Sequence, residues 1–240
     1  MTQTIKKTIH RANERGYANH GWLQSYHSFS FADYYNPQKM SFGLLRVIND
    51  DRIAAGGGFG MHGHQDMEIV TIPLYGNLKH QDSIGNSSVI SAGEVQIMSA
   101  GTGIRHSEFN YSEKDKVELL QIWVLPKEKG IKPRYDQQKF DLNDRKNKFE
   151  TVVSPNEDGK AVWINQNAFF SLASIEEGKS IEYKLKDPNN GIYVYLIEGE
   201  IEVADEKLES RDALGLEGIQ GSEIQAKEKS EVLVIEVPMN

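Results

Sequence analysis

The sequence predicts an all-β protein made of two antiparallel barrels or sandwiches with few short helices. Short runs in which apolar and polar residues alternate recur along the 240 residues, and this is the period of a half-buried strand. β-Branched and aromatic residues dominate these runs, and Gly, Asn, Asp or Pro separate them. A strand-turn-strand phrase from the first half also returns in the second half. These three observations favour closed or stacked sheets.

Seven segments carry the strand pattern most clearly. In chain order they are residues 41–48 (SFGLLRVI), 67–74 (MEIVTIPL), 88–100 (SVISAGEVQIMSA), 117–126 (VELLQIWVLP), 168–175 (AFFSLASI), 191–199 (GIYVYLIEG) and 231–237 (EVLVIEV). Each segment is bounded by residues that favour turns, so we expect each to contribute a strand or one arm of a hairpin.

A weak internal repeat divides the chain. YLIEGEIEV at 195–203, followed by SRDALGLEG at 210–218, parallels IPLYGNLKH at 72–80, followed by SAGEVQIMSAG at 91–101. We therefore expect an N-terminal barrel over residues 1–133 and a C-terminal barrel over 134–240. Because such hairpins are common, chance similarity is the alternative to duplication.

Composition excludes several classes of function. The chain has no cysteine, which removes disulfides, thiolate nucleophiles and iron-sulfur clusters, so that a metal must be held by nitrogen and oxygen. Residues 1–106 hold 9 Lys and Arg against 8 Asp and Glu, whereas residues 107–240 hold 18 against 27. An acidic second half without a basic cluster argues against direct nucleic-acid binding. The sequence shows no targeting segment and no membrane span, and we expect a cytoplasmic protein.

All seven histidines lie within the first 106 residues, and three of them belong to two closely spaced pairs. His62 and His64 stand two residues apart in GMHGHQDME, and His106 and Glu108 stand two apart in RHSEFN. Alternate side chains of an extended strand project to the same face, with α-carbons about 6.5 to 7 Å apart. Two such pairs on neighbouring strands would suit a divalent first-row metal and leave coordination positions open. A lone His-x-His pair is often merely solvated, so the prediction depends on the second pair.

Two stretches resemble the motifs of the cupin superfamily. The order G-x5-H-x-H-x3-E occupies residues 56–68, and residues 93–106 resemble the second motif. Longer phrases are similar to those of the pirin family of bicupins, above all the bacterial pirin-like quercetin 2,3-dioxygenases. These phrases are RANERGYANHGWL, HSFSFADYYNP, LLRVINDD, GFGMHGHQDMEIVT, HQDSIGN, EVQIMSAGTGIRHSE and QIWVLP. The resemblance is dense over residues 8–136 and loose over the rest of the chain.

The resemblance implies two stacked antiparallel β-barrels of jelly-roll type, with one divalent transition metal in the N-terminal barrel. By motif position the metal ligands are His62, His64, His106 and Glu108. Iron is the usual metal of the family, and the ligand types also suit Mn, Co, Ni, Cu or Zn. Glu68, the fourth ligand of other cupins, falls outside the pirin set and is expected to support the site or the fold. Many relatives have proline in place of Gly63, so the ligand strand is expected to be less rigid here.

The resemblance also implies quercetin 2,3-dioxygenase activity. Such an oxidoreductase opens the heterocyclic ring of a flavonol with O2 and releases carbon monoxide, and Glu108 would be the base that accepts the proton of the substrate's 3-hydroxyl. Two alternatives stay open. One is a regulatory, protein-binding factor in which the metal has no dedicated catalytic role, and the other is a non-catalytic binder of metal or small molecules. We expect a monomer, since the fold closes its own sheets.

A flat aromatic substrate would need an apolar slot. Four large apolar residues in or beside the metal-bearing strands are the candidate lining residues, with plain core as the alternative: Phe59, Met61, Met98 and Trp123. His20 and His27 are expected to make structural hydrogen bonds beneath the first barrel. His80 is expected to cap a turn with Asp82.

Overall fold

A computed structural model describes residues 5–157 and 159–240. Residues 1–4, part of the stretch in which we expected no targeting segment, lie outside the described residues. The strands of the first half are β1 Lys6–His10, β2 Gly16–Asn19, β3 Leu23–His27, β4 Leu45–Ile53, β5 Gly58–His64, β6 Glu68–Tyr75, β7 Asn77–Asp82, β8 Ser87–Ser91, β9 Glu94–Ser99, β10 Ile104–Asn110, β11 Val117–Val124 and β12 Arg134–Lys139. Those of the second half are β13 Glu150–Ser154, β14 Val162–Trp163, β15 Phe169–Ile175, β16 Ser180–Lys184, β17 Asn190–Glu198, β18 Glu200–Val203, β19 Glu206–Glu209, β20 Ala213–Glu217, β21 Gly221–Ala226 and β22 Ser230–Pro238.

Helical structure is confined, within these ranges, to two short 3₁₀ helices. They are η1, Ala12–Glu14, and η2, Leu142–Arg145. None of the helices in the described part of the chain is long and apolar enough to cross a membrane.

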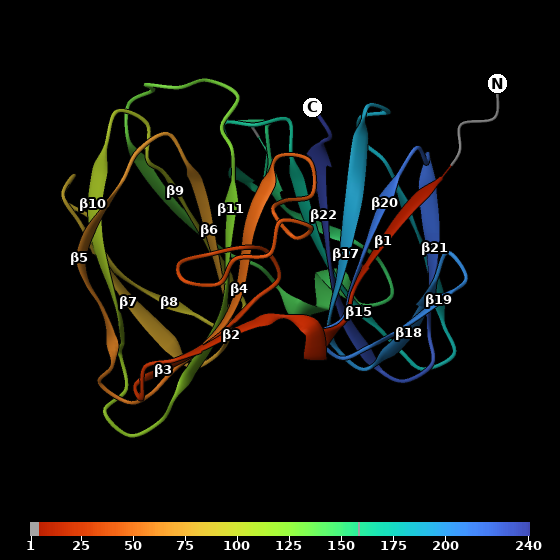
Figure 1. Cartoon of the computed structure of the whole chain (residues 1–240), viewed down its shortest axis with the longest axis horizontal. Helices are drawn as coiled ribbons and strands as arrows, with labels where there is room; N and C mark the ends of the chain where they lie inside the picture. Colours follow the sequence, from red (N-terminus) through yellow and green to blue (C-terminus); the bar gives the residue numbers. More distant parts are fainter. Residues whose placement is uncertain (1–4, 158) are drawn as a thin grey trace.

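Four sheets form two sandwiches that lie side by side (Figure 1). The N-terminal sandwich pairs a seven-stranded sheet, β12-β9-β6-β11-β4-β3-β2, with a four-stranded sheet, β5-β10-β7-β8. The C-terminal sandwich pairs β1-β20-β17-β22-β15-β13-β14 with β16-β21-β18-β19. The predicted all-β fold of two stacked jelly-roll units is therefore confirmed, except that the units are open sandwiches rather than closed barrels.

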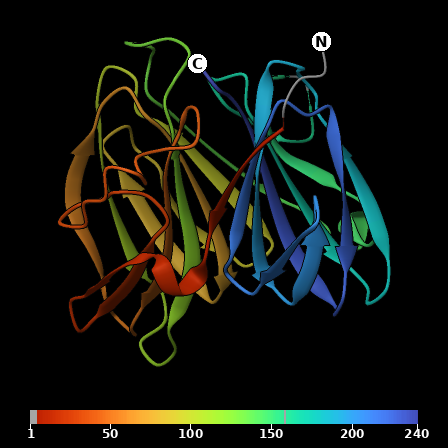
Figure 2. The same ribbon diagram turned by 45° about the vertical axis from the view of Figure 1, so that its right-hand side comes forward.

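Two strands cross between the sandwiches. β1 pairs along its length with β20 of the C-terminal sandwich, and β12 pairs with β9 of the N-terminal sandwich. Figure 2 shows β1, in red, running beside the blue strands of the C-terminal sandwich. We propose a domain boundary after residue 133. Two strands pair across this boundary: β1 with the C-terminal sandwich and β12 with the N-terminal sandwich.

A continuous apolar core joins the two seven-stranded sheets. Ile48 and Leu120 from the first sheet belong to the same buried cluster as Phe170, Tyr193 and Leu233 from the second. These side chains alternate along their strands with residues that point into each sandwich, as the period of two requires. The hydrophobic effect therefore holds the sandwiches together.

The interiors of the two sandwiches differ in character. The interior of the C-terminal sandwich is one apolar cluster, whereas that of the N-terminal sandwich is divided into two smaller ones. Along β11, Leu119 belongs to one of these clusters, Trp123 packs against the other, and the buried Gln121 lies between them. A belt of polar side chains thus crosses the N-terminal sandwich, where a purely structural core would be apolar.

Glu68 ties the two sandwiches together. Its buried carboxylate accepts hydrogen bonds from Ser99 Oγ at 2.8 Å and from the backbone N–H of Asn165, in the C-terminal sandwich, at 3.1 Å. Burial raises the pKa of Glu68 from 4.5 to about 7, although these two hydrogen bonds act in the opposite direction. Glu68 does not line the cavity described below, and its role is structural.

Replacing Glu68 by glutamine is expected to change how stability depends on pH. The folded state holds the Glu68 proton more tightly than the unfolded state, so its contribution to the unfolding free energy falls as pH rises from 4.5 to about 7. The upper bound is roughly 1.4 kcal/mol for each pH unit. In urea unfolding, the stability of Glu68→Gln relative to wild type should therefore increase as pH rises from 4.5 to about 7. Above about pH 7 the difference in unfolding free energy between the two proteins should be constant. Glu177→Gln, at an exposed position, is the control, and a difference independent of pH would contradict the prediction.

Candidate metal centre

Strands β5 and β10 bring the predicted ligands into one region. The two strands pair antiparallel in the four-stranded sheet, with His106 opposite His62 and Ile104 opposite His64. Between His106 and Glu108 the register shifts, so that Glu108 stands opposite Phe59. Since Phe59 and His62 are three residues apart and their partners only two, the extra residue of this β-bulge lies in β5. His106 and Glu108 are both buried, at 1% and 2% exposure.

Three imidazoles converge at this point. One ring nitrogen from each of His62, His64 and His106 lies within 4.8 Å of the other two, and the Nε2 atoms of His64 and His106 are 3.0 Å apart. His62 donates from Nδ1 to the carbonyl of Gly60 at 2.8 Å, which leaves its Nε2 unprotonated in the neutral ring. The histidines expected to act together are thus placed together.

The environment of His64 and His106 favours their uncharged forms. Burial, reinforced by the neighbouring His62, lowers the pKa of His64 to about 4. Burial and the other histidines of the cluster lower the pKa of His106 to about 2. A metal ligand must present a lone pair, and a histidine can do so only when it is neutral.

Glu108 adjoins the cluster without belonging to the same compact group. Its carboxylate lies within 4.8 Å of nitrogens of His80 and His106, and this second group is fully buried. Gln121 Nε2 donates to Glu108 Oε2 at 2.8 Å. Burial raises the pKa of Glu108, and the Gln121 hydrogen bond opposes that shift. A small movement of the Glu108 side chain would carry its carboxylate from its position beside Gln121 to a position beside the three imidazoles.

His80 takes part in this region as well as in a turn. Its Nε2 lies 3.2 Å from Asp82 Oδ2, and Asp82 also accepts backbone N–H groups of the turn that follows, so the expected pairing with Asp82 is present. The His80 ring is also fully buried, with its centroid 5.3 Å from that of His106. His80 therefore pairs with Asp82 at the turn, as expected, and its buried ring also lies beside His106.

The donor set fits a divalent first-row metal. Neutral imidazole nitrogens with a nearby carboxylate are the ligand types that such ions prefer. His106 Nδ1 is buried and has no hydrogen-bond partner among the described residues. Three imidazoles this close together, two of them with pKa values lowered by burial, are an arrangement that suits metal ligands better than a packed core.

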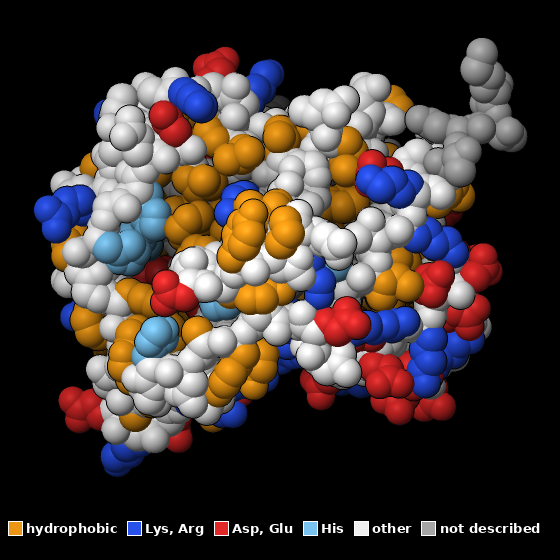
Figure 3. Space-filling model, viewed as in Figure 1, with side chains coloured by type: hydrophobic (Ala, Val, Ile, Leu, Met, Phe, Trp, Pro, Cys, Tyr) orange, Lys and Arg blue, Asp and Glu red, His pale blue; other side chains and the backbone are white. Residues whose placement is uncertain are grey.

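A cavity of about 380 Å³ opens beside the imidazoles, within the range of sites that hold drug-sized ligands. His62, His64 and Glu108 form part of its wall, and Phe59 and Trp123 line it as expected. In Figure 3, pale-blue histidine side chains reach the surface of the N-terminal sandwich beside exposed apolar side chains. The cavity thus combines the cluster with an aromatic wall.

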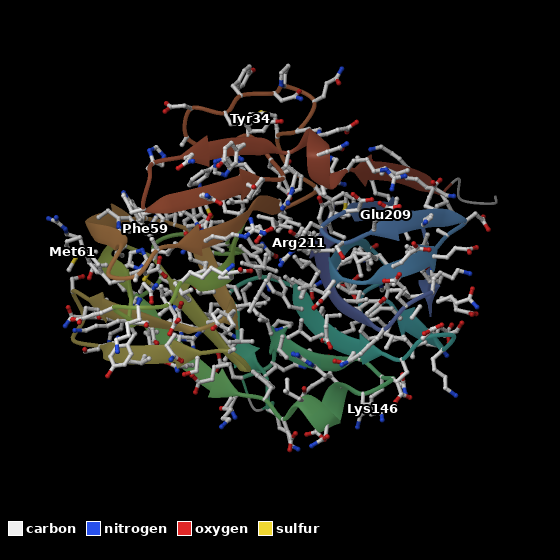
Figure 4. All side chains as sticks on the ribbon, turned by 90° about the horizontal axis from the view of Figure 1, so that it is seen from below. Tyr34, Phe59, Met61, Lys146, Glu209 and Arg211 are labelled. Atoms are coloured by element: carbon white, nitrogen blue, oxygen red, sulfur yellow. The ribbon has the colours of Figure 1, made fainter. Side chains whose placement is uncertain are left out.

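Met61 and Met98 are not lining residues, contrary to expectation. Met61 alternates with the inward-facing His62 and is 50% exposed, at the outer edge of the sandwich, whereas Phe59 lies farther in (Figure 4). Met98 faces inward but is fully buried in an apolar cluster with Ile69 and Ile104. The presence of a residue in or beside a strand that carries the ligands therefore did not predict whether its side chain faces the cavity, the apolar core or the outer surface.

His20 and His27 line the cavity instead of lying beneath the barrel. His27 is buried and its Nδ1 lies 2.8 Å from Asn49 Oδ1, so the expected structural hydrogen bond is present, but at the cavity wall. Most of the remaining wall comes from positions that the sequence did not single out: Ala18, Trp22, Leu23, Ser25, Phe31, Ala32, Asn49, Asp51 and Gln121. The phrases RANERGYANHGWL and HSFSFADYYNP were the available signal for the part of this wall before β4.

Gly101 fixes the turn that leads into β10. Its backbone has a positive φ of 46°, and a Cβ atom there would overlap the carbonyl oxygen of Ile131. Gly101→Ala is therefore expected to lower the unfolding free energy by on the order of 2–4 kcal/mol. Chemical denaturation of Gly101→Ala and of Gly60→Ala, whose Cβ would meet nothing within 4 Å, would test this. Equal midpoints for the two variants would contradict the prediction.

Comparison with known families assigns both halves of the chain. Residues 8–124 match the family Pirin, and residues 151–237 match the family described as Quercetinase C-terminal cupin domain. Together these matches cover most of the chain, including β5 and β10.

Individual relatives align over nearly the whole chain. A protein of Escherichia coli K12 named quercetin 2,3-dioxygenase is 44% identical over 231 residues, covering 96% of this chain and 98% of its own. A pirin-like protein of Caulobacter vibrioides is 40% identical over 222 residues, covering 92% and 95%. The crystal structure of the bacterial pirin YhhW of E. coli in complex with nickel(II) superposes with a TM-score of 0.91 at 42% identity, covering 97% of this chain and 99% of that one.

Proposed function

Because the chain belongs to the pirin family, we propose that it is a metal-dependent oxidoreductase that cleaves the heterocyclic ring of flavonols such as quercetin with O2 and releases carbon monoxide. The observation that carries this proposal is a cluster of three imidazoles beside a buried carboxylate, of which His62, His64 and Glu108 line a cavity with an aromatic wall. The E. coli relative named quercetin 2,3-dioxygenase, which is similar over 96% of this chain, supports it.

His62, His64 and His106 are the proposed metal ligands, and Glu108 is the proposed fourth. When bound, a divalent metal would act as a Lewis acid toward the flavonol oxygens and supply the redox chemistry of O2 addition. Iron is the usual metal of the family, and nickel(II) occupies the related E. coli structure. Imidazole and carboxylate ligands bind both iron and nickel, so the availability of each metal in the cell would decide which one is bound.

Glu108 is the proposed general base. The 3-hydroxyl of a flavonol must lose its proton before the ring can react, and a buried carboxylate with a raised pKa is a better base than an exposed one. Gln121 Nε2 donates to Glu108 Oε2 at 2.8 Å, whereas Thr71 Oγ1 lies 3.5 Å from Oε1, so the more weakly held Oε1 is the proposed acceptor of the substrate proton. Gln121 would therefore position the base.

Aromatic side chains of the cavity would orient the flat substrate and exclude water. The ring of Trp123 makes edge contacts with His64, at 4.9 Å between centroids, and with Phe31, at 5.3 Å. Phe59 packs edge-on against Trp22 at 5.1 Å, also at the cavity wall. Aromatic pairs of this kind are rigid and bury large areas, which suits the binding of a planar ligand.

Reconstitution tests the proposal directly. Purified protein would be loaded with Fe(II), Mn, Co, Ni or Cu, and the visible absorbance of quercetin would be followed in air and under nitrogen. We expect bleaching that requires protein-bound metal and oxygen, with carbon monoxide as a product. Bleaching at the same rate by metal alone, or no bleaching with any of these metals, would reject the dioxygenase.

A further inference from the structure

The cavity has a second polar wall that lies across from the candidate metal ligands. The ligands come from β5 and β10 of the four-stranded sheet, whereas Ser25, His27, Asn49 and Asp51 come from β3 and β4 of the seven-stranded sheet that faces it. We call these four residues the polar wall. In register, Ser25 stands opposite Asp51 and His27 opposite Asn49. The polar wall therefore lies on two adjacent, hydrogen-bonded strands, and its position is fixed by their register.

Hydrogen bonds within the polar wall fix its side chains. Ser25 Oγ donates to Asp51 Oδ1 and lies 3.4 Å from His27 Nδ1. His27 Nδ1 lies 2.8 Å from Asn49 Oδ1, so the capacity that Asn49 retains is its amide nitrogen, a donor. Residue exposure is 2–3% for all four residues, so none of them is a solvated surface group.

Asp51 is the least expected member of the wall. It forms no ion pair among the described residues, although a buried carboxylate is normally paired with a cation. Its neighbour Asp50, on the other face of β4, has Arg15 at 3.2 Å and Arg211 at 3.5 Å. Burial raises the pKa of Asp51 to about 7, although the Ser25 hydrogen bond lowers it. A carboxyl in this state donates or accepts a hydrogen bond, and it borders the cavity.

We infer that Asp51 and Asn49 form a second binding subsite, which takes a hydroxyl group of the substrate remote from the group held at the metal centre. A phenolic hydroxyl both donates and accepts, which matches a carboxyl beside an amide donor. The substrate class is then an aromatic compound with hydroxyl groups at two separated positions, and an aromatic with a single chelating hydroxyl is a poorer ligand. This inference rests on the proposed function for its substrate scaffold and adds the second point of recognition.

Ligand binding without turnover tests the subsite. Trp22 and Trp123 line the cavity, so quenching of tryptophan fluorescence under nitrogen reports binding to nickel-loaded protein. The two probes are quercetin and 3-hydroxyflavone, which keeps the 3-hydroxyl and the neighbouring carbonyl but lacks the other hydroxyls. Wild type is expected to bind quercetin about tenfold more tightly, the effect of one good hydrogen bond. Asp51→Leu should abolish this preference and leave the Kd of 3-hydroxyflavone within about twofold, whereas Asp51→Asn should keep part of it.

Several outcomes would overturn the inference. They are equal weakening of both ligands by Asp51→Leu, an unchanged preference in that variant, and a wild type that binds neither ligand or shows no preference. Gln24→Ala, an exposed change on β3 next to Ser25, is the control, and thermal melts verify that each variant is folded. Because the assay involves no turnover, a wild type that shows the preference but never bleaches quercetin would uphold the subsite and reject the dioxygenase.

Discussion

His64→Ala is expected to abolish flavonol bleaching and to lower the affinity for the divalent metal at least about 100-fold. The variant removes one of three imidazoles that each place one ring nitrogen within 4.8 Å of the others, and the remaining two cannot surround the ion in the same way. Loss of a side chain that merely supports a ligand costs roughly 10- to 100-fold in metal affinity, so loss of a ligand should cost more. Metal content after dialysis, measured by elemental analysis, and oxygen-dependent bleaching are the two readouts.

Gly63→Ala is the matched control for this variant. Gly63 stands next to His64 on β5, and the nearest atoms to a Cβ there are 3.8 Å away, so alanine fits without displacing the strand. Full metal content and activity are expected in the control. If His64→Ala retained its metal and its rate, the ion would be bound elsewhere and the proposed centre would be rejected.

Glu108→Gln is expected to separate metal binding from catalysis. The glutamine keeps the shape of the side chain, its hydrogen-bond partner Gln121 and a carbonyl oxygen that can face the ion, and the three histidines are unchanged. Metal affinity should therefore fall much less than in His64→Ala, and kinetics are compared at saturating metal. The amide cannot accept a proton, and loss of a positioned base typically costs 10²- to 10⁴-fold in rate. We therefore expect kcat to fall by about that factor, while the Kd for quercetin under nitrogen changes little.

The control for Glu108→Gln makes the same chemical change outside the cavity. Glu113 is exposed in the loop after β10, so Glu113→Gln alters net charge by the same amount without touching the site. Its kinetics should match wild type. A Glu108→Gln enzyme that turns over at the wild-type rate would show that another group accepts the substrate proton.

The sequence predicted the architecture because alternation of apolar residues is a local signal. Strands such as β6 and β22 are visible in seven or eight consecutive letters. In the structure both are buried over nearly their whole length, because they are central strands whose two faces pack against different apolar layers. The same locality explains the prediction of His62, His64, His106 and Glu108, since each pair lies in one short motif. Their convergence was open until the pairing of β5 with β10 placed them.

The polar wall was missed because its residues resemble a turn. The expected strand at 41–48 stopped before Asn49, Asp50 and Asp51, which usually mark the end of a strand, but β4 continues to Ile53. These side chains stay inside the sheet because each has a partner distant in the sequence, such as Ser25 for Asp51. Partners that lie far apart in the chain leave no local pattern, so the cavity wall could be seen only in the folded protein.

The pairing of β1 with β20 of the C-terminal sandwich has a consequence for folding during synthesis. Strand β20 is synthesised about 200 residues after β1, so β1 cannot make this pairing until long after it has left the ribosome. Folding with such distant contacts is slow, and an unpaired β-edge is open to wrong partners in the meantime. Nascent chains stalled before β20 should therefore be captured by chaperones, and maturation of the complete fold should be a late, post-translational event.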